Sequence, residues 1–117
     1  MHQVENLTCE FGPYRLNLTE RSLTRDGEVV ALSPKATEIL VRLVTNAGCL
    51  VEKDDLLRDV WPDTFVEESN LTQNIFILRR ALGDERAEPK YIETVARRGY
   101  RFVASVRVVA NAPSIDG

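Results

Sequence analysis

Residues 69–83 read SNLTQNIFILRRALG, with apolar and polar side chains alternating at helical spacing. The apolar residues recur every three or four positions, at Leu71, Ile75, Leu78 and Leu82. This spacing predicts an α-helix over residues 69–82 with one face packed on other helices. Gly83 stands where a helix of this length is expected to end.

The other side of this helix is polar but carries little charge. It holds Asn70, Gln73, Asn74, Ile77 and Arg80, with Phe76 and Arg79 on its flanks. Asparagine and glutamine amides pair with adenine edges, and an apolar side chain can meet a thymine methyl group. A helix in the major groove presents such a face. The alternative is a solvated face that happens to hold amides, although Lys and Glu are more usual there.

The second signal is a basic turn that follows this helix. Residues 90–104 predict two strands around the turn Ala96-Arg97-Arg98-Gly99. A hairpin with arginines at its tip can place one of them in the minor groove, where the potential is most negative. The alternative is an ordinary charged turn.

Two further helices are predicted upstream. Ser33-Pro34 is a favourable start for the first, whose apolar face comprises Ala36, Ile39, Leu40, Leu43, Val44 and Ala47. The second spans about residues 53–61 and buries Leu56, Leu57, Val60 and Trp61. We expect Trp61 to be buried beneath the third helix, against Leu57 and Leu78.

The N-terminal part reads as antiparallel strands. Apolar and polar residues alternate over residues 14–19, and Asp26-Gly27 is a strong hairpin signal. The predicted order over residues 8–105 is therefore an N-terminal antiparallel sheet, a three-helix core and a C-terminal β-hairpin. This is one α+β domain, and residues 106–117 are expected to form a tail or linker.

The net charge of −3 is unusual for a nucleic-acid binder, but the charges are segregated along the chain. Residues 52–68 contain seven acidic and two basic residues, whereas residues 79–101 contain seven basic and four acidic residues. One basic face and one acidic face are therefore expected.

Several classes of function find no support in the residues. The only histidine is His2, no nucleophile motif or phosphate-binding glycine loop is present, and we expect neither an enzyme nor a cofactor. Cys9 and Cys49 lack further ligands for a metal, and we expect both to be buried free thiols in a reducing compartment. No apolar run reaches the length of a membrane span.

Five segments in this order resemble the OmpR/PhoB-type winged-helix effector domain, in particular the one-component branch typified by CadC and ToxR. They are LSPK at 32–35, LLRDVWP at 56–62, LTQNI at 71–75, LRRALGD at 78–84 and IETV through RGYRF at 92–102. The resemblance covers roughly residues 9–104. It implies a winged helix-turn-helix that binds double-stranded DNA in a bacterial transcriptional regulator, in the cytoplasm.

The resemblance also implies roles for particular segments. The helix at about 69–82 would enter the major groove, and the wing at about 95–100 would meet the minor groove. The acidic segment 62–68 would correspond to a loop that contacts RNA polymerase. The expected DNA-binding residues are Asn70, Thr72, Gln73, Asn74, Ile77, Arg79, Arg80, Thr94, Arg97, Arg98, Tyr100 and Arg101.

This sequence departs from the resemblance at one place. Relatives with a receiver domain often carry several basic residues in the recognition helix, whereas Phe76 and Ile77 stand here. Weaker phosphate binding, and hence tandem or dimeric binding on DNA, is the expectation. The net acidity leaves one alternative open, a winged-helix module for protein contacts without DNA binding.

Overall fold

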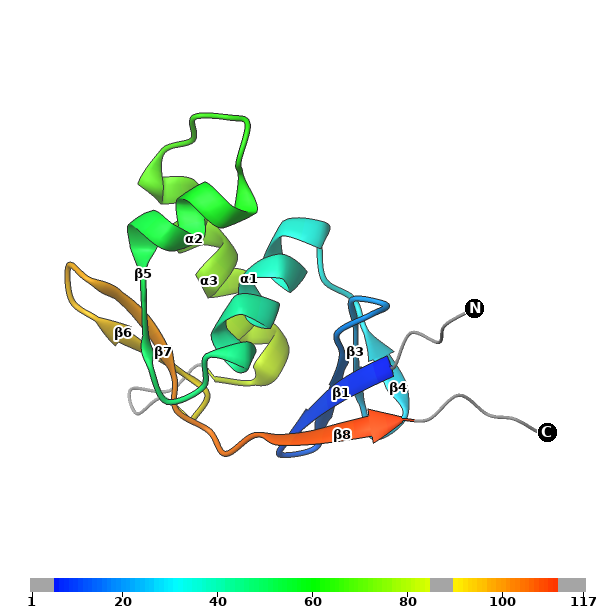
Figure 1. Cartoon of the computed structure of the whole chain (residues 1–117). Helices are drawn as coiled ribbons and strands as arrows, with labels where there is room; N and C mark the ends of the chain where they lie inside the picture. Colours follow the sequence, from blue (N-terminus) through cyan, green and yellow to red (C-terminus); the bar gives the residue numbers. More distant parts are fainter. Residues whose placement is uncertain (1–5, 85–89, 112–117) are drawn as a thin grey trace.

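The computed structural model describes residues 6–84 and 90–111. Three helices lie between two antiparallel sheets (Figure 1). The larger sheet occupies one end of the domain, and a hairpin from the smaller sheet projects at the other end. This agrees with the predicted α+β arrangement of sheet, three helices and hairpin.

The larger sheet has five strands in the order β4-β3-β2-β1-β8. Their bounds are Asn6–Phe11 for β1, Tyr14–Asn17 for β2, Ser22–Arg25 for β3, Glu28–Val30 for β4 and Arg107–Asn111 for β8. Cys9, Leu16 and Leu23 are paired across three adjacent strands and are all buried. This row forms the apolar face that covers the helices.

Strand β8 differs from the expected tail. It pairs antiparallel with β1, with Glu10 opposite Arg107 and Cys9 opposite Val108. Its partner lies almost the whole chain away, and no local turn signal announces such a pairing. Residues 112–117, the rest of the expected tail, lie outside the described residues.

Helix α1 spans Pro34–Thr45, and the Ser33 hydroxyl accepts a hydrogen bond from the Ala36 amide at 3.2 Å, as an N-cap does. The predicted apolar face is buried except at its last member, Ala47, which is exposed. The prediction for Ala47 was wrong because Asn46 already caps the helix.

Helix α2 spans Lys53–Val60 and ends one residue earlier than predicted. Trp61 follows the last residue of the helix and is half-buried, so the expectation of full burial beneath α3 was wrong. The Lys35 ammonium covers it instead, 5.7 Å from the ring centroid, while donating to the Val60 carbonyl at 2.8 Å. Cys49, just before this region, is exposed rather than buried.

Helix α3 spans Glu68–Leu82, and its predicted apolar face is confirmed. Leu71, Ile75, Leu78 and Leu82 are each at most 3% exposed. Gly83 ends the helix in the left-handed conformation, with φ of 71°. The buried face fixes the rotation of α3 about its axis, and hence which side chains point outward.

The smaller sheet has the order β5-β7-β6, with bounds Leu50–Glu52, Gly99–Phe102 and Ile92–Val95 respectively. Strand β5, for which the sequence analysis predicted no strand, pairs antiparallel with β7. The rings of Phe11 and Phe102 meet edge to face with centroids 5.0 Å apart, joining the two sheets through the core.

Candidate nucleic-acid interface

The outward face of α3 is a stripe of five exposed side chains. They lie three or four positions apart along α3, with Phe76 and Ile77 as adjacent members, and comprise Ser69, Gln73, Phe76, Ile77 and Arg80. Among the described residues, the Gln73 side chain has no hydrogen-bond partner, so its amide group is available to a ligand. Phe76 was expected on a flank, but 54% of its surface is exposed.

Three other predicted residues lie toward the edges of this stripe and bond to the helix itself. Asn74 is half-buried and donates to the Asn70 carbonyl at 2.8 Å. The Thr72 hydroxyl donates to the Glu68 carbonyl at 3.3 Å. Asn70 and Thr72 remain exposed at the first turns of α3. These two bonds use side-chain donors of Thr72 and Asn74 within the helix.

The tip of the β6–β7 hairpin presents two exposed arginines. Arg97 has φ of 67°, a left-handed conformation that turns the chain between the strands. The Arg98 amide donates to the Val95 carbonyl at 2.9 Å and closes the turn. The Arg98 guanidinium lies 3.8 Å from the Glu52 carboxylate, with both side chains more than half exposed. Such a surface pair holds Arg98 only weakly.

Arg79 joins α3 to the hairpin. Its guanidinium donates to the Ile92 carbonyl at 3.0 Å and to the Thr94 hydroxyl at 2.6 Å. The side chain is half-buried, whereas Thr94 is exposed. The structure therefore places Arg79, predicted to contact DNA, between the helix and the hairpin.

Asp84 makes a second joint, which the sequence analysis did not single out. Its carboxylate is 3% exposed and accepts from the amides of Lys90 at 2.7 Å, Tyr91 at 3.1 Å and Ile92 at 2.9 Å. These bonds fix the start of β6 against the end of α3. The only sequence signal was an acidic residue directly after the helix-ending glycine.

Tyr100 and Arg101, also predicted to contact DNA, are half-buried on β7. Arg101 pairs with Glu93 on β6 at 3.2 Å. The cation is thus partly neutralised within the hairpin, and Arg80, Arg97 and Arg98 are the more exposed arginines of this region.

The acidic loop between α2 and α3 projects beyond the helices (Figure 1). Phe65 in this loop is 93% exposed. Directly after the loop, at the first residue of α3, the Glu68 carboxylate pairs with the Lys53 ammonium at 3.2 Å. The loop therefore adds acidic surface next to the N-terminus of α3.

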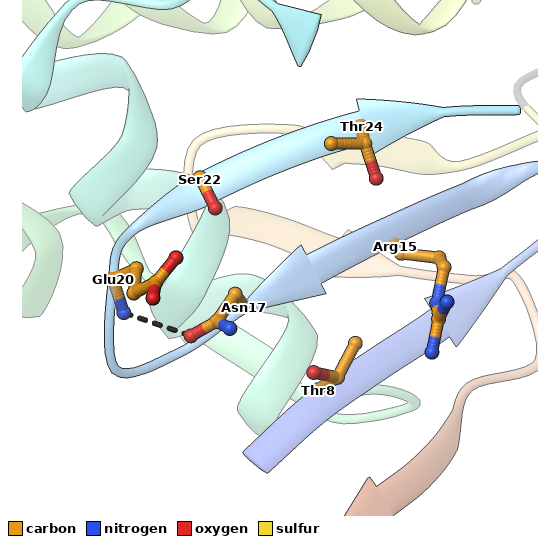
Figure 2. A pocket seen from close by; sticks show the side chains of 6 residues that line it. All are labelled: Thr8, Arg15, Asn17, Glu20, Ser22 and Thr24. Carbon is orange, nitrogen blue, oxygen red and sulfur yellow. Dashed lines mark hydrogen bonds between the residues drawn. The ribbon is translucent and has the colours of Figure 1, made fainter. Parts of the chain in front are cut away.

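A shallow polar hollow lies elsewhere, on the face of the larger sheet turned away from the helices (Figure 2). Thr8, Arg15, Asn17, Glu20, Ser22 and Thr24 line it. Asn17 accepts from the Glu20 amide at 2.8 Å, which closes the β2–β3 turn. This hollow shares no residue with the α3 stripe or the hairpin tip.

Within residues 6–84 and 90–111, no cluster of three or more potential metal ligands occurs. In the same ranges, no helix has the length and apolar character required to cross a bilayer.

The chain matches the family model described as "Transcriptional regulatory protein, C terminal" over residues 27–102. It is 41% identical over 107 residues to the transcriptional regulator HilA of Salmonella typhimurium. That alignment covers 92% of this chain but only 19% of HilA, so the chain spans about a fifth of that relative's length.

The solved structures that share the fold include two DNA-binding domains. One is the RstA DNA-binding domain of Klebsiella pneumoniae in complex with the RstA box, with a TM-score of 0.72 and 34% identity. The match covers 82% of this chain and 96% of that one. The other is the DNA-binding domain of Escherichia coli CadC, with a TM-score of 0.74, 27% identity, and coverage of 89% and 98%.

Proposed function

The chain belongs to the family of C-terminal domains of transcriptional regulatory proteins, and we propose that it binds double-stranded DNA with α3 in the major groove and the β6–β7 tip at the minor groove. The membership confirms the predicted OmpR/PhoB-type winged-helix fold. It also identifies the domain as a DNA-binding module of transcription regulation rather than an enzyme.

The observation that carries the proposed geometry is the fixed relation between two exposed elements. Arg79 and Asp84 hold the hairpin against α3 through six hydrogen bonds to residues 90–94. The α3 stripe and the arginine tip therefore form one rigid unit. A unit of this kind suits B-DNA, in which the major and minor grooves lie side by side.

Within this unit, the side chains divide by role. Gln73 and Ile77 face outward from the middle of α3 and are assigned to base edges. Arg97 and Arg98 are assigned to the minor groove or its phosphates, and Arg80 to a phosphate or a base. Asn70 and Thr72 are assigned to the backbone at the edge of the groove. Arg79 acts as a positioning residue.

Further partners belong to the same proposal. The acidic loop, residues 62–68, suits a basic protein surface better than DNA, and we assign it to RNA polymerase. The sparse positive charge of α3 favours binding of two domains in tandem or as a dimer on adjacent half-sites. The site of action is the cytoplasm.

Measuring affinity for two kinds of duplex tests the proposal. A binding site selected from a randomised library is titrated beside a random duplex with the wild type, Gln73→Ala and Arg98→Ala. Gln73→Ala should lose about 1–3 kcal/mol on the selected site and little on the random duplex. Arg98→Ala should weaken both, because contacts to the phosphates carry general affinity.

Arg15→Ala, an exposed arginine on the larger sheet, is the matched control and should change neither affinity. Melting curves establish that each variant is folded. If the library yields no enriched site, the protein-interaction alternative replaces the proposal. If Gln73→Ala leaves the ratio of the two affinities unchanged, α3 is not the reading element.

A further inference from the structure

Phe76 is an aromatic side chain in an unusual position. It lies on the outward stripe of α3, between Gln73 one turn before and Arg80 one turn after, and 54% of its surface is exposed. Beside it, Ile77 is 37% exposed. The two side chains form an apolar ridge on a face that is otherwise polar. Water contact with such a ridge is unfavourable, and a partner that covers it gains free energy.

Arg80 places a positive charge beside this apolar ridge. Its guanidinium carbon lies 5.8 Å from the centroid of the Phe76 ring, at the i, i+4 spacing that brings helix side chains together. A cation over the ring restrains it and places positive charge beside the apolar surface. A partner that covers Phe76 must therefore offer an apolar group close to negative charge.

The major groove of DNA offers that combination. Its exposed apolar group is the C5 methyl of thymine, which lies between two phosphate backbones. Resting on the DNA binding proposed above, we infer that Phe76 is a specificity-determining residue that contacts a thymine methyl group. Phe76 thus selects a base pair that the Gln73 amide does not read.

Deoxyuridine provides a direct test, because it lacks only the C5 methyl group and keeps the hydrogen-bonding edge of thymine. The selected duplex is prepared in versions in which each thymine of the half-site is replaced singly by deoxyuridine. The wild-type chain should bind one of these duplexes about fourfold more weakly, because one methyl group fewer is buried in that complex.

Two variants at Phe76 then locate the contact. Phe76→Ala should bind the thymine duplex and that deoxyuridine duplex equally, because the group that meets the methyl is gone. Phe76→Leu retains an apolar side chain and should restore part of the difference. Val29→Ala, which truncates another exposed apolar side chain on β4, is the control and should keep the full difference. Melting curves show that the variants are folded.

Three results overturn the inference. They are a wild type insensitive to every replacement, a selected site without thymine in the half-site, and a Phe76→Ala variant as sensitive as the wild type. In each case DNA binding itself is intact, so the proposed function stands. Failure of the library to enrich any duplex instead refutes the proposed function.

Discussion

The two cysteines differ in their accessibility. Cys9 is buried in β1, and this burial raises the pKa of its thiol, whereas Cys49 is exposed before β5. The thiolate is the reactive form, and reaction also requires access. Iodoacetamide should therefore alkylate Cys49 alone in the folded protein and both cysteines after unfolding in urea. Peptide mass spectrometry identifies the sites, and early alkylation of Cys9 would contradict the packing of the larger sheet.

Gly99 is required for close approach of two strands. A Cβ added there would lie 2.1 Å from the Val51 carbonyl oxygen and 2.9 Å from the Glu52 Cα, both backbone atoms. Since strands β5 and β7 would have to separate, Gly99→Ala should lower the free energy of unfolding by about 1–3 kcal/mol. Urea unfolding measures this change. Ser105→Ala, at an exposed position, should be near neutral, and equal stability of the two variants would refute the close approach.

At the scale of elements, the hydrogen bonds that connect Asp84 to the start of β6 can also be tested by a substitution and urea unfolding. Asparagine keeps one acceptor oxygen where the carboxylate uses two for three amides. Asp84→Asn should therefore cost about 1–3 kcal/mol and should speed hydrogen exchange at Tyr91 and Ile92. Asp59→Asn, on the exposed side of α2, is the matched control. Unchanged exchange at the start of β6 would show that Asp84 does not hold the hairpin.

Strand β8 is joined to its neighbours by an ion triplet. Glu10 on β1 pairs with Arg107 on β8 at 2.5 Å and with Arg15 on β2 at 3.1 Å. The hydrogen bond from Arg107 lowers the pKa of Glu10 below its ordinary value of 4.5. This pair therefore contributes stability at pH values above 4.5, and the contribution is lost as the pH falls through the lowered pKa.

The pH dependence of the free energy of unfolding tests the contribution of this ion triplet. Glu10→Gln should reduce the loss of stability on acidification below pH 4.5. Glu28→Gln, at an exposed position on β4, should leave the acid limb as it is in the wild type. Urea unfolding at a series of pH values gives both curves. Superimposable curves for Glu10→Gln and the wild type would show that the triplet contributes nothing.

Local pattern predicted the helices and the hairpin well, because helical spacing, capping residues and turn residues act within a few positions. Strands β5 and β8 were not recognised as members of sheets, since their partners, β7 and β1, are distant in sequence. The candidate site also combines features set by local sequence with features set by distant partners. The apolar face of α3 was predicted, but the commitment of Arg79 to the hairpin depends on tertiary packing.

At the scale of the whole molecule, the formal charge of −3 must be reconciled with binding to a polyanion. The domain does so by geometry. The arginine tip lies at the end opposite the larger sheet (Figure 1), and Arg80 lies on the outward stripe of α3. The acidic loop lies next to the start of α3 and repels phosphates there. Few phosphate contacts per domain are therefore expected, and two domains should share a site.

Salt dependence measures this number. With Arg80, Arg97 and Arg98 on phosphates, the slope of log K against log salt should be about −3 for one domain, at about −0.9 per contact. A tandem site should give about twice that slope. Arg98→Ala should make the single-domain slope shallower by about one unit. Arg15→Ala, on the larger sheet, should leave it unchanged. Equal slopes for Arg98→Ala and the wild type would remove the hairpin tip from the interface, because a cation in contact with a phosphate must release a counterion.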